Sequence, residues 1–231
     1  QIALGITLKL GKLITDNMAD VNIIYTRQTD TFVELHQRAS IANHNNAALF
    51  ICIHCNSNKV KKVTGSETYV MGMHVSEQNL DVAKRENEAI LMEENYQKKY
   101  EGFDPKSPEA NIVFSLYQNA YLEQSLQFAG MVQNQLRKRT SRTNRGVRQA
   151  GFVVLFKTTM PSVLIEAGFL SNQEEEQYLA SDKGQEETAR AIFLPSLCNL
   201  RLILFPMISR VSAWALAHPK TLSAASKWAG I

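Results

Sequence analysis

The sequence lacks several features that would place it in a specialised class of protein. It has three cysteines among 231 residues, which is too few, and an odd number, for a disulfide framework. No expected strand is followed by a glycine-rich phosphate loop, which disfavours a nucleotide-binding domain. The net charge of +3 is too small to indicate nucleic acid. These absences leave a globular domain, and a hydrophobic content of 45% is sufficient for one core.

Both ends of the chain lack features found in its middle. Residues 1–8 have no basic start followed by an apolar run, so no signal peptide is visible, and we expect the true start to lie upstream. All 22 acidic residues lie at or before Glu187, and the apolar run Leu202–Phe205 is far shorter than the roughly 20 residues that cross a bilayer. We expect residues 194–231 to be an atypical tail outside the conserved fold, with a membrane-surface segment as the alternative.

Between these ends, apolar residues alternate between helical and strand-like spacing. This order favours a three-layer α/β fold with a mostly parallel sheet and flanking helices. We expect a single domain over residues 1–193, with a helical insertion at about residues 76–146. The expected strands are residues 21–26, 47–54, 66–72, 152–156 and 162–166, and the expected helices are residues 2–14, 33–42, 77–98, 108–138, 172–179 and 183–193.

Two titratable residues follow hydrophobic strands directly. His54 ends the run Leu49–Ile53, and Glu166 follows Val163, Leu164 and Ile165. The carboxyl ends of strands are where open α/β sheets place their active sites. A carboxylate in such a position is costly unless it is paired, hydrogen-bonded or near a metal. Each residue alone could be an ordinary satisfied polar group, but together they indicate a catalytic or metal site.

Several separate motifs resemble the zinc-dependent N-acetylmuramoyl-L-alanine amidases. The resemblance covers residues 1 to about 193, and the motifs occur in the order found in that family. The segments that carry it are Ile24–Asp30, Leu35 with Arg38 and Ala42–Asn43, Leu49–Asn56, Gly65–Tyr69, Phe152–Leu155 and Met160–Asn172.

The resemblance implies a zinc-peptidase-like, phosphorylase/hydrolase-like fold and a specific chemistry. His54 would be a Zn²⁺ ligand and Glu166 the catalytic glutamate of an enzyme that cuts the amide between N-acetylmuramic acid and L-alanine in peptidoglycan. Zinc can lower the pKa of bound water to about 7, and a nearby carboxylate can move the proton to the leaving amine. Asn56 would contact substrate or cap the next turn, and Arg38 would form a structural ion pair near the site.

The chain departs from the family pattern at its start. The family's other two zinc ligands, a histidine and a glutamate, come before the point where this sequence begins, as does its first strand. We therefore expect weak zinc binding and little activity from residues 1–231 alone. Replacement by His36, His44 or His74 is not expected, because the first two lie on a polar helix and the third follows a strand that faces the insertion.

The insertion resembles a segment that some larger family members use to cover the zinc site until an activator protein removes it. It could equally be a groove wall with solvated charges such as Arg85 and Glu86. The basic run Arg137–Arg139 could meet anionic wall polymer or end a helix. Cys52 and Cys55 form a Cys-x-x-Cys around His54, but Cys52 lies within a strand, so core packing is favoured over redox chemistry.

The sequence thus predicts a peptidoglycan hydrolase of the bacterial cell envelope, periplasmic or secreted, with the location inferred from the substrate. It predicts neither a nucleic-acid partner nor a membrane span. Two alternatives stay open: a non-catalytic wall-binding or regulatory relative, and another zinc peptidase or deacylase on the same scaffold.

Overall fold

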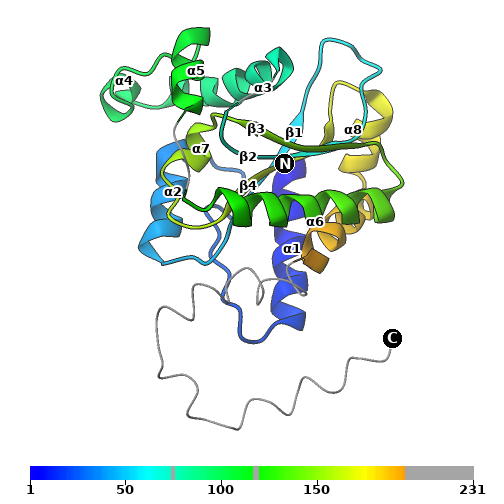
Figure 1. Cartoon of the computed structure of the whole chain (residues 1–231). Helices are drawn as coiled ribbons and strands as arrows, with labels where there is room; N and C mark the ends of the chain where they lie inside the picture. Colours follow the sequence, from blue (N-terminus) through cyan, green and yellow to red (C-terminus); the bar gives the residue numbers. More distant parts are fainter. Residues whose placement is uncertain (74–75, 117–119, 196–231) are drawn as a thin grey trace, which may run out of the picture.

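The structure, a computed structural model, describes residues 1–73, 76–116 and 120–195. Helices lie on both sides of a central sheet, which gives the three layers expected from the sequence (Figure 1). In chain order the elements are α1 (Ile2–Asn17), α2 (Leu35–His44), β1 (Phe50–Asn56), β2 (Ser66–Met71), α3 (Glu77–Asn87), the 3-10 helix η1 (Glu88–Met92), α4 (Tyr96–Lys99), α5 (Pro108–Ser115), α6 (Leu122–Thr140), β3 (Asn144–Ala150), α7 (Val153–Phe156), β4 (Ser162–Phe169), α8 (Gln173–Ala180) and a last helical stretch at residues 182–195.

The four strands of the described part lie in the order β1-β4-β2-β3. β1 is parallel to β4 and β2 is parallel to β3, while β2 and β4 are antiparallel. Two of the three pairings are therefore parallel, which confirms the mostly parallel sheet. The antiparallel pairing brings the start of β2 to the same edge of the sheet as the ends of β1 and β4.

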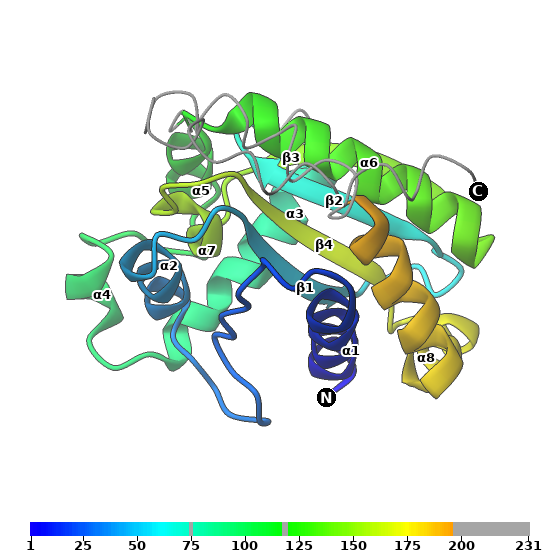
Figure 2. The same cartoon turned by 90° about the horizontal axis from the view of Figure 1, so that it is seen from below.

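Each strand sends alternate side chains to two separate cores, as a sheet covered on both faces requires. On β4, Val163 and Ile165 face α1, α6 and the last helix, which Figure 2 shows on one side of the sheet. Leu164 faces the other core, which includes residues of α2, α3, η1 and α7. Because Glu166 lies two residues after Leu164, its side chain emerges on the face covered by α3.

Side-chain caps fix where three helices begin. Ser76 accepts a hydrogen bond from the backbone N–H of Asn79 at the start of α3, and Ser107 does the same for Ala110 in α5. Asn172 accepts from two backbone N–H groups at the start of α8. Such caps satisfy donors that a helix leaves unpaired in its first turn. The insertion thus begins on a well-defined helix directly above the sheet.

The expected strand at residues 152–156 is wrong. Residues 153–156 form the short helix α7, and the strand next to β2 is Asn144–Ala150 instead. The backbone N–H of Val153 donates to the side chain of Asn87 on α3, so a tertiary contact holds this turn. The β-branched residues favoured a strand, but this packing overrides their local propensity.

The expected strand at residues 21–26 is also absent from the structure. Its half-buried and exposed residues alternate as in a strand, yet no neighbouring strand supplies ladder hydrogen bonds. A cavity of about 860 Å³ lies beside this segment, lined also by residues of α1 and β1. Residues 21–26 therefore have the alternating burial of a strand, but they lack the hydrogen-bonded neighbouring strand that a sheet requires.

The helices expected in the insertion are shorter than the sequence pattern indicated. Residues 77–98 divide into α3, η1 and α4, and residues 108–138 divide into α5 and α6 around positions outside the described residues. Nearly all of the tail expected at residues 194–231, and His74, also lie outside the described residues. Among the described helices, none is long and apolar enough to cross a membrane.

Candidate active site

The two residues singled out from the sequence lie directly opposite each other. His54 on β1 pairs in register with Glu166 on β4, and Glu166 in turn pairs with Glu67 on β2. The sheet therefore brings an imidazole and two carboxylates to one edge, from three neighbouring strands. Glu67 was not predicted as a site residue, because it lies at the start of its strand and only the antiparallel pairing brings it here.

A fourth element, the helix α3, covers this edge. The Oε2 atom of Glu86, on α3, lies 2.5 Å from Nδ1 of His54, and Nε of Arg85 lies 3.7 Å from the other Glu86 oxygen. The side chains of His54 and Glu86 are only 20% and 18% exposed. The interpretation of Glu86 as a solvated charge is therefore wrong. Its sequence position near the end of a polar helix gave no signal of this contact.

The opposite charges of His54 and Glu86 stabilise each other although both side chains are largely buried. Burial alone would raise the pKa of Glu86, but the charge and hydrogen bond of His54 outweigh it, so the pKa of Glu86 is lowered. Burial also opposes protonation of His54, but Cys52 and Glu86 outweigh it and raise the pKa of His54 well above its usual range. The contact between α3 and β1 is thus an ion pair in a poorly solvated place.

Glu166 is the most unusual residue of the site. It is completely buried, and neither of its carboxylate oxygens has a hydrogen-bond partner in the described part of the protein. Burial, and next the nearby charge of Glu86, raise the pKa of Glu166 well above its usual range, with His54 opposing them. A buried carboxyl group without a partner costs stability. Such a group is typical of a site built to act on a proton or to bind a cation.

A hydrogen-bonded layer supports these residues from behind. Asn56 is 1% exposed; its amide donates to Glu67 at 2.7 Å, and its oxygen accepts from Arg85 at 2.6 Å. Arg148 forms an ion pair of 2.8 Å with Glu67. Asn56, expected to contact substrate or cap a turn, thus connects three elements behind the site and also accepts from the N–H of Ser57.

The remaining sequence expectations fall outside this cluster. Nε of Arg38 donates to the carbonyl of Val33, and the described residues include no ion pair of this side chain, contrary to the expected structural ion pair. Arg38 lines the cavity beside α1 instead. Burial raises the pKa of Cys55 to about 12, so its thiol is not activated for redox chemistry.

The donor set fits a zinc ion. One ligand atom each from His54, Glu86 and Glu166 lies within 4.8 Å of the other two. Imidazole nitrogen and carboxylate oxygen are ordinary zinc ligands. The partnerless oxygens of Glu166 are also what a cation nearby would satisfy. Neither His36 nor His44 belongs to this group.

An imidazole and a partnerless carboxyl group at the strand ends of a helix-covered sheet lie where open α/β proteins place their active sites. The sequence comparison is more specific: the model of the N-acetylmuramoyl-L-alanine amidase family matches residues 1–194. The chain belongs to this family.

Among its relatives are two amidases of Escherichia coli. AmiC of strain CFT073 is 29% identical over 197 residues, covering 83% of this chain and 45% of AmiC. AmiA of strain K12 is 28% identical over 194 residues, covering 83% of this chain and 65% of AmiA. The chain thus spans less than two thirds of either relative. The crystal structure of an N-acetylmuramoyl-L-alanine amidase from Clostridium difficile 630 matches with a TM-score of 0.61 at 25% identity, covering 85% of this chain and 80% of that one.

Proposed function

We propose that the protein is a zinc-dependent hydrolase that cleaves the amide between N-acetylmuramic acid and L-alanine in peptidoglycan. The observation that carries this proposal is the buried, partnerless Glu166 opposite His54, within the frame of the amidase family. His54 would hold the metal in this proposal, with Glu86 as a second ligand while α3 covers the site. Bound zinc would lower the pKa of water and polarise the scissile carbonyl.

Glu166 carries the proton in the proposed reaction. Because the pKa of Glu166 is raised, its carboxylate is a stronger base than an ordinary glutamate. It takes a proton from the attacking water and then delivers that proton to the leaving amine of L-alanine. Asn56 and Arg148 hold Glu67 behind it, so they orient the site without touching the reacting atoms.

The contact between Glu86 and His54 supports a closed form of the enzyme. With α3 in place Glu166 is fully buried and Glu86 contacts His54, so this form leaves no room for a substrate at either residue. We propose that α3 acts as a lid and that an activator protein binding to the insertion displaces it. Peptidoglycan is then the substrate, and the cell envelope the place of action.

The decisive experiment compares Glu166→Gln with Glu174→Gln in a protein that also carries the family's upstream zinc ligands, both with Glu86 in place and in a Glu86→Ala background that removes the lid contact. Glu174 lies exposed on α8, so it is a matched control for the loss of one carboxylate. We expect Glu166→Gln to lower peptide release from purified peptidoglycan by about 10² or more, as for loss of a general base. Glu174→Gln should have no effect.

Analysis of the products separates the alternatives. A new free amine on L-alanine indicates the amidase, whereas cleavage between two amino acids indicates a peptidase. Binding to peptidoglycan without products in the Glu86→Ala background would support the non-catalytic wall-binding relative. Full activity of Glu166→Gln in that background would remove the role assigned to Glu166.

A further inference from the structure

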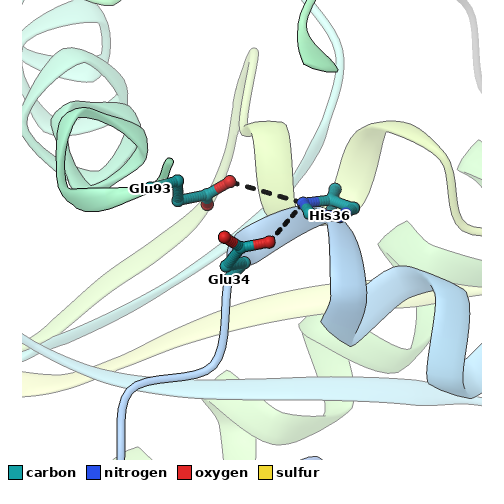
Figure 3. A group of neighbouring side chains, drawn as sticks. All are labelled: Glu34, His36 and Glu93. Atoms are coloured by element: carbon teal, nitrogen blue, oxygen red, sulfur yellow. Dashed lines mark hydrogen bonds and ion pairs between the residues drawn. The ribbon is translucent and has the colours of Figure 1, made fainter. Parts of the chain in front are cut away.

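A second cluster of histidine and glutamate lies where the insertion meets the body of the protein. Glu34 directly precedes α2, His36 lies in the first turn of α2, and Glu93 follows η1 of the insertion (Figure 3). None of these residues belongs to the group around His54. The three side chains point toward one another from two segments that are far apart in the sequence.

The distances within the cluster suit a metal ion. Nδ1 of His36 lies 3.5 Å from Oε2 of Glu34 and 3.3 Å from Oε2 of Glu93. A tetrahedral zinc ion with ligand distances of about 2.0–2.2 Å places its ligand atoms about 3.3–3.6 Å apart. The side chains of His36 and Glu34 are 33% and 20% exposed, so the fourth position can take a water.

Other contacts hold the carboxylates in this orientation. Lys99 binds Oε1 of Glu34 at 2.6 Å, whereas Oε2 faces His36 and also accepts a hydrogen bond from the side-chain amide of Gln37 at 3.1 Å. The backbone N–H of Leu35 donates to Oε1 of Glu93 at 2.8 Å, and the Tyr100 hydroxyl donates to both Glu93 oxygens. Metal-binding side chains are commonly oriented by such outer contacts.

The charges of the cluster also favour a cation. Two carboxylates face one lysine, so with a neutral imidazole the group carries one uncompensated negative charge. The Glu93 side chain is 0% exposed, so water cannot solvate that charge well. A divalent ion between Glu93 and the other two residues would bind the buried carboxylate directly.

We propose that Glu34, His36 and Glu93 form a second divalent-metal site, of the type that takes Zn²⁺, which fastens the insertion to the start of α2. The site contributes no residue to the cluster at His54, and the proposal does not rest on the proposed function. Its ligands come from both sides of the junction, so the bound ion would stabilise the packing of η1 and α4 against the body.

Zinc binding to full-length variants tests this site. In a His54→Asn background, which weakens the first site, equilibrium dialysis against Zn²⁺ should show one bound ion through the second site. Adding His36→Asn should remove that ion, because asparagine can keep a hydrogen bond toward Glu93 but supplies no imidazole nitrogen. The matched control is His44→Asn at the exposed end of the same helix, which should still bind one ion.

The midpoint of thermal unfolding gives a second measurement of zinc binding. Zn²⁺ at about 100 times its dissociation constant should raise the midpoint by about 5–10 °C in the His54→Asn protein and not in the double variant. Glu34→Gln should weaken zinc binding to the second site at least tenfold. This variant replaces His36→Asn in the test if His36→Asn does not fold without metal. The second site would be overturned if the zinc content and the zinc-induced shift of the unfolding midpoint were the same with and without His36. Loss of one ion on His54→Asn alone, by contrast, reports on the first site and on the proposed function.

Discussion

Two buried glutamates show how the same residue type can serve structure or chemistry. Glu175 accepts hydrogen bonds from the backbone N–H groups of Gly65 and Phe169, and Arg142 lies 2.7 Å from it. Glu166, which is 0% exposed against 5% for Glu175, has no such partner among the described residues. The contrast identifies Glu175 as an anchor that joins the turn before β2, the end of β4 and the segment before β3, whereas no such structural contact explains Glu166.

Replacing Glu175 should therefore cost much stability. Glu175→Ala leaves Arg142, only 12% exposed, without its carboxylate, and it also removes acceptors from two backbone donors. Loss of one partner of a buried pair costs about 3–5 kcal/mol. Urea unfolding should show this loss, while Glu174→Ala one residue away should change the unfolding free energy by no more than about 0.5 kcal/mol. A small effect of Glu175→Ala would mean that the anchor relaxes without it.

Tyr178 provides a test in alkaline solution. Burial, followed by its hydrogen bond to Glu187, raises the pKa of Tyr178 to about 12. The folded protein thus holds this proton more tightly than the unfolded chain, so the stabilisation is complete below about pH 10 and is lost as the pH rises toward 12. Tyr178→Phe should lower the melting temperature at pH 8, and the gap to the natural protein should narrow by pH 11. A gap that does not change with pH would contradict the raised pKa.

Residue patterns predicted His54 and Glu166, because both follow directly after strongly hydrophobic strands. They could not reveal Glu86 or Glu67. Glu86 reaches the site only through the packing of α3 over the sheet, and Glu67 only through the antiparallel pairing of β2 with β4. The spacing of residues along the sequence predicts neither how a helix packs on the sheet nor the direction in which a strand pairs.

At the scale of elements, α3 is held over the sheet by one amide as well as by Glu86. Asn87 is 1% exposed; its amide donates to Asn111 on α5 and to the carbonyl of Gly151, and its oxygen accepts from Val153. This side chain therefore joins α3, α5 and the turn before α7. The same contacts explain why residues 153–156 form a helix where their composition favoured a strand.

Asn87→Ala should loosen α3 from the sheet while leaving the sheet folded. Removing the amide leaves a buried backbone donor and acceptor unpaired, which costs about 1–3 kcal/mol each. Hydrogen exchange should become faster in α3 and α5 than in β1 and β4. Asn134→Ala, on the exposed face of α6, is the control and should change neither region. Uniformly faster exchange would instead show that α3 and the sheet unfold together.

At the scale of the whole molecule, the tail expected from the sequence begins where the family match ends. That match covers residues 1–194, and among the described residues the hydrophobic cores extend to Phe193. We expect a chain that ends at residue 195 to unfold in urea within about 0.5 kcal/mol of the 231-residue chain, as for changes outside packed regions. A clear loss of stability would show that residues beyond 195 contribute to the fold.

The layer order and most strands followed from the sequence, because alternating apolar runs determine which segments can be buried in a sheet. The partner of each strand did not follow, and residues 21–26 show the consequence. They have the pattern of a strand but lie beside a cavity rather than beside another strand.

The pairing of β1 with β4 also determines when the site can exist during synthesis. Phe50 pairs with Ser162, which is 112 positions later in the chain. Parallel pairing over such a separation forms slowly, because a long loop must close before any contact compensates for it. A nascent chain that has reached β3 already carries His54, Glu67 and Glu86, but it lacks β4 and therefore Glu166. The pairing of His54 with Glu166 can therefore form only after β4 has been synthesised.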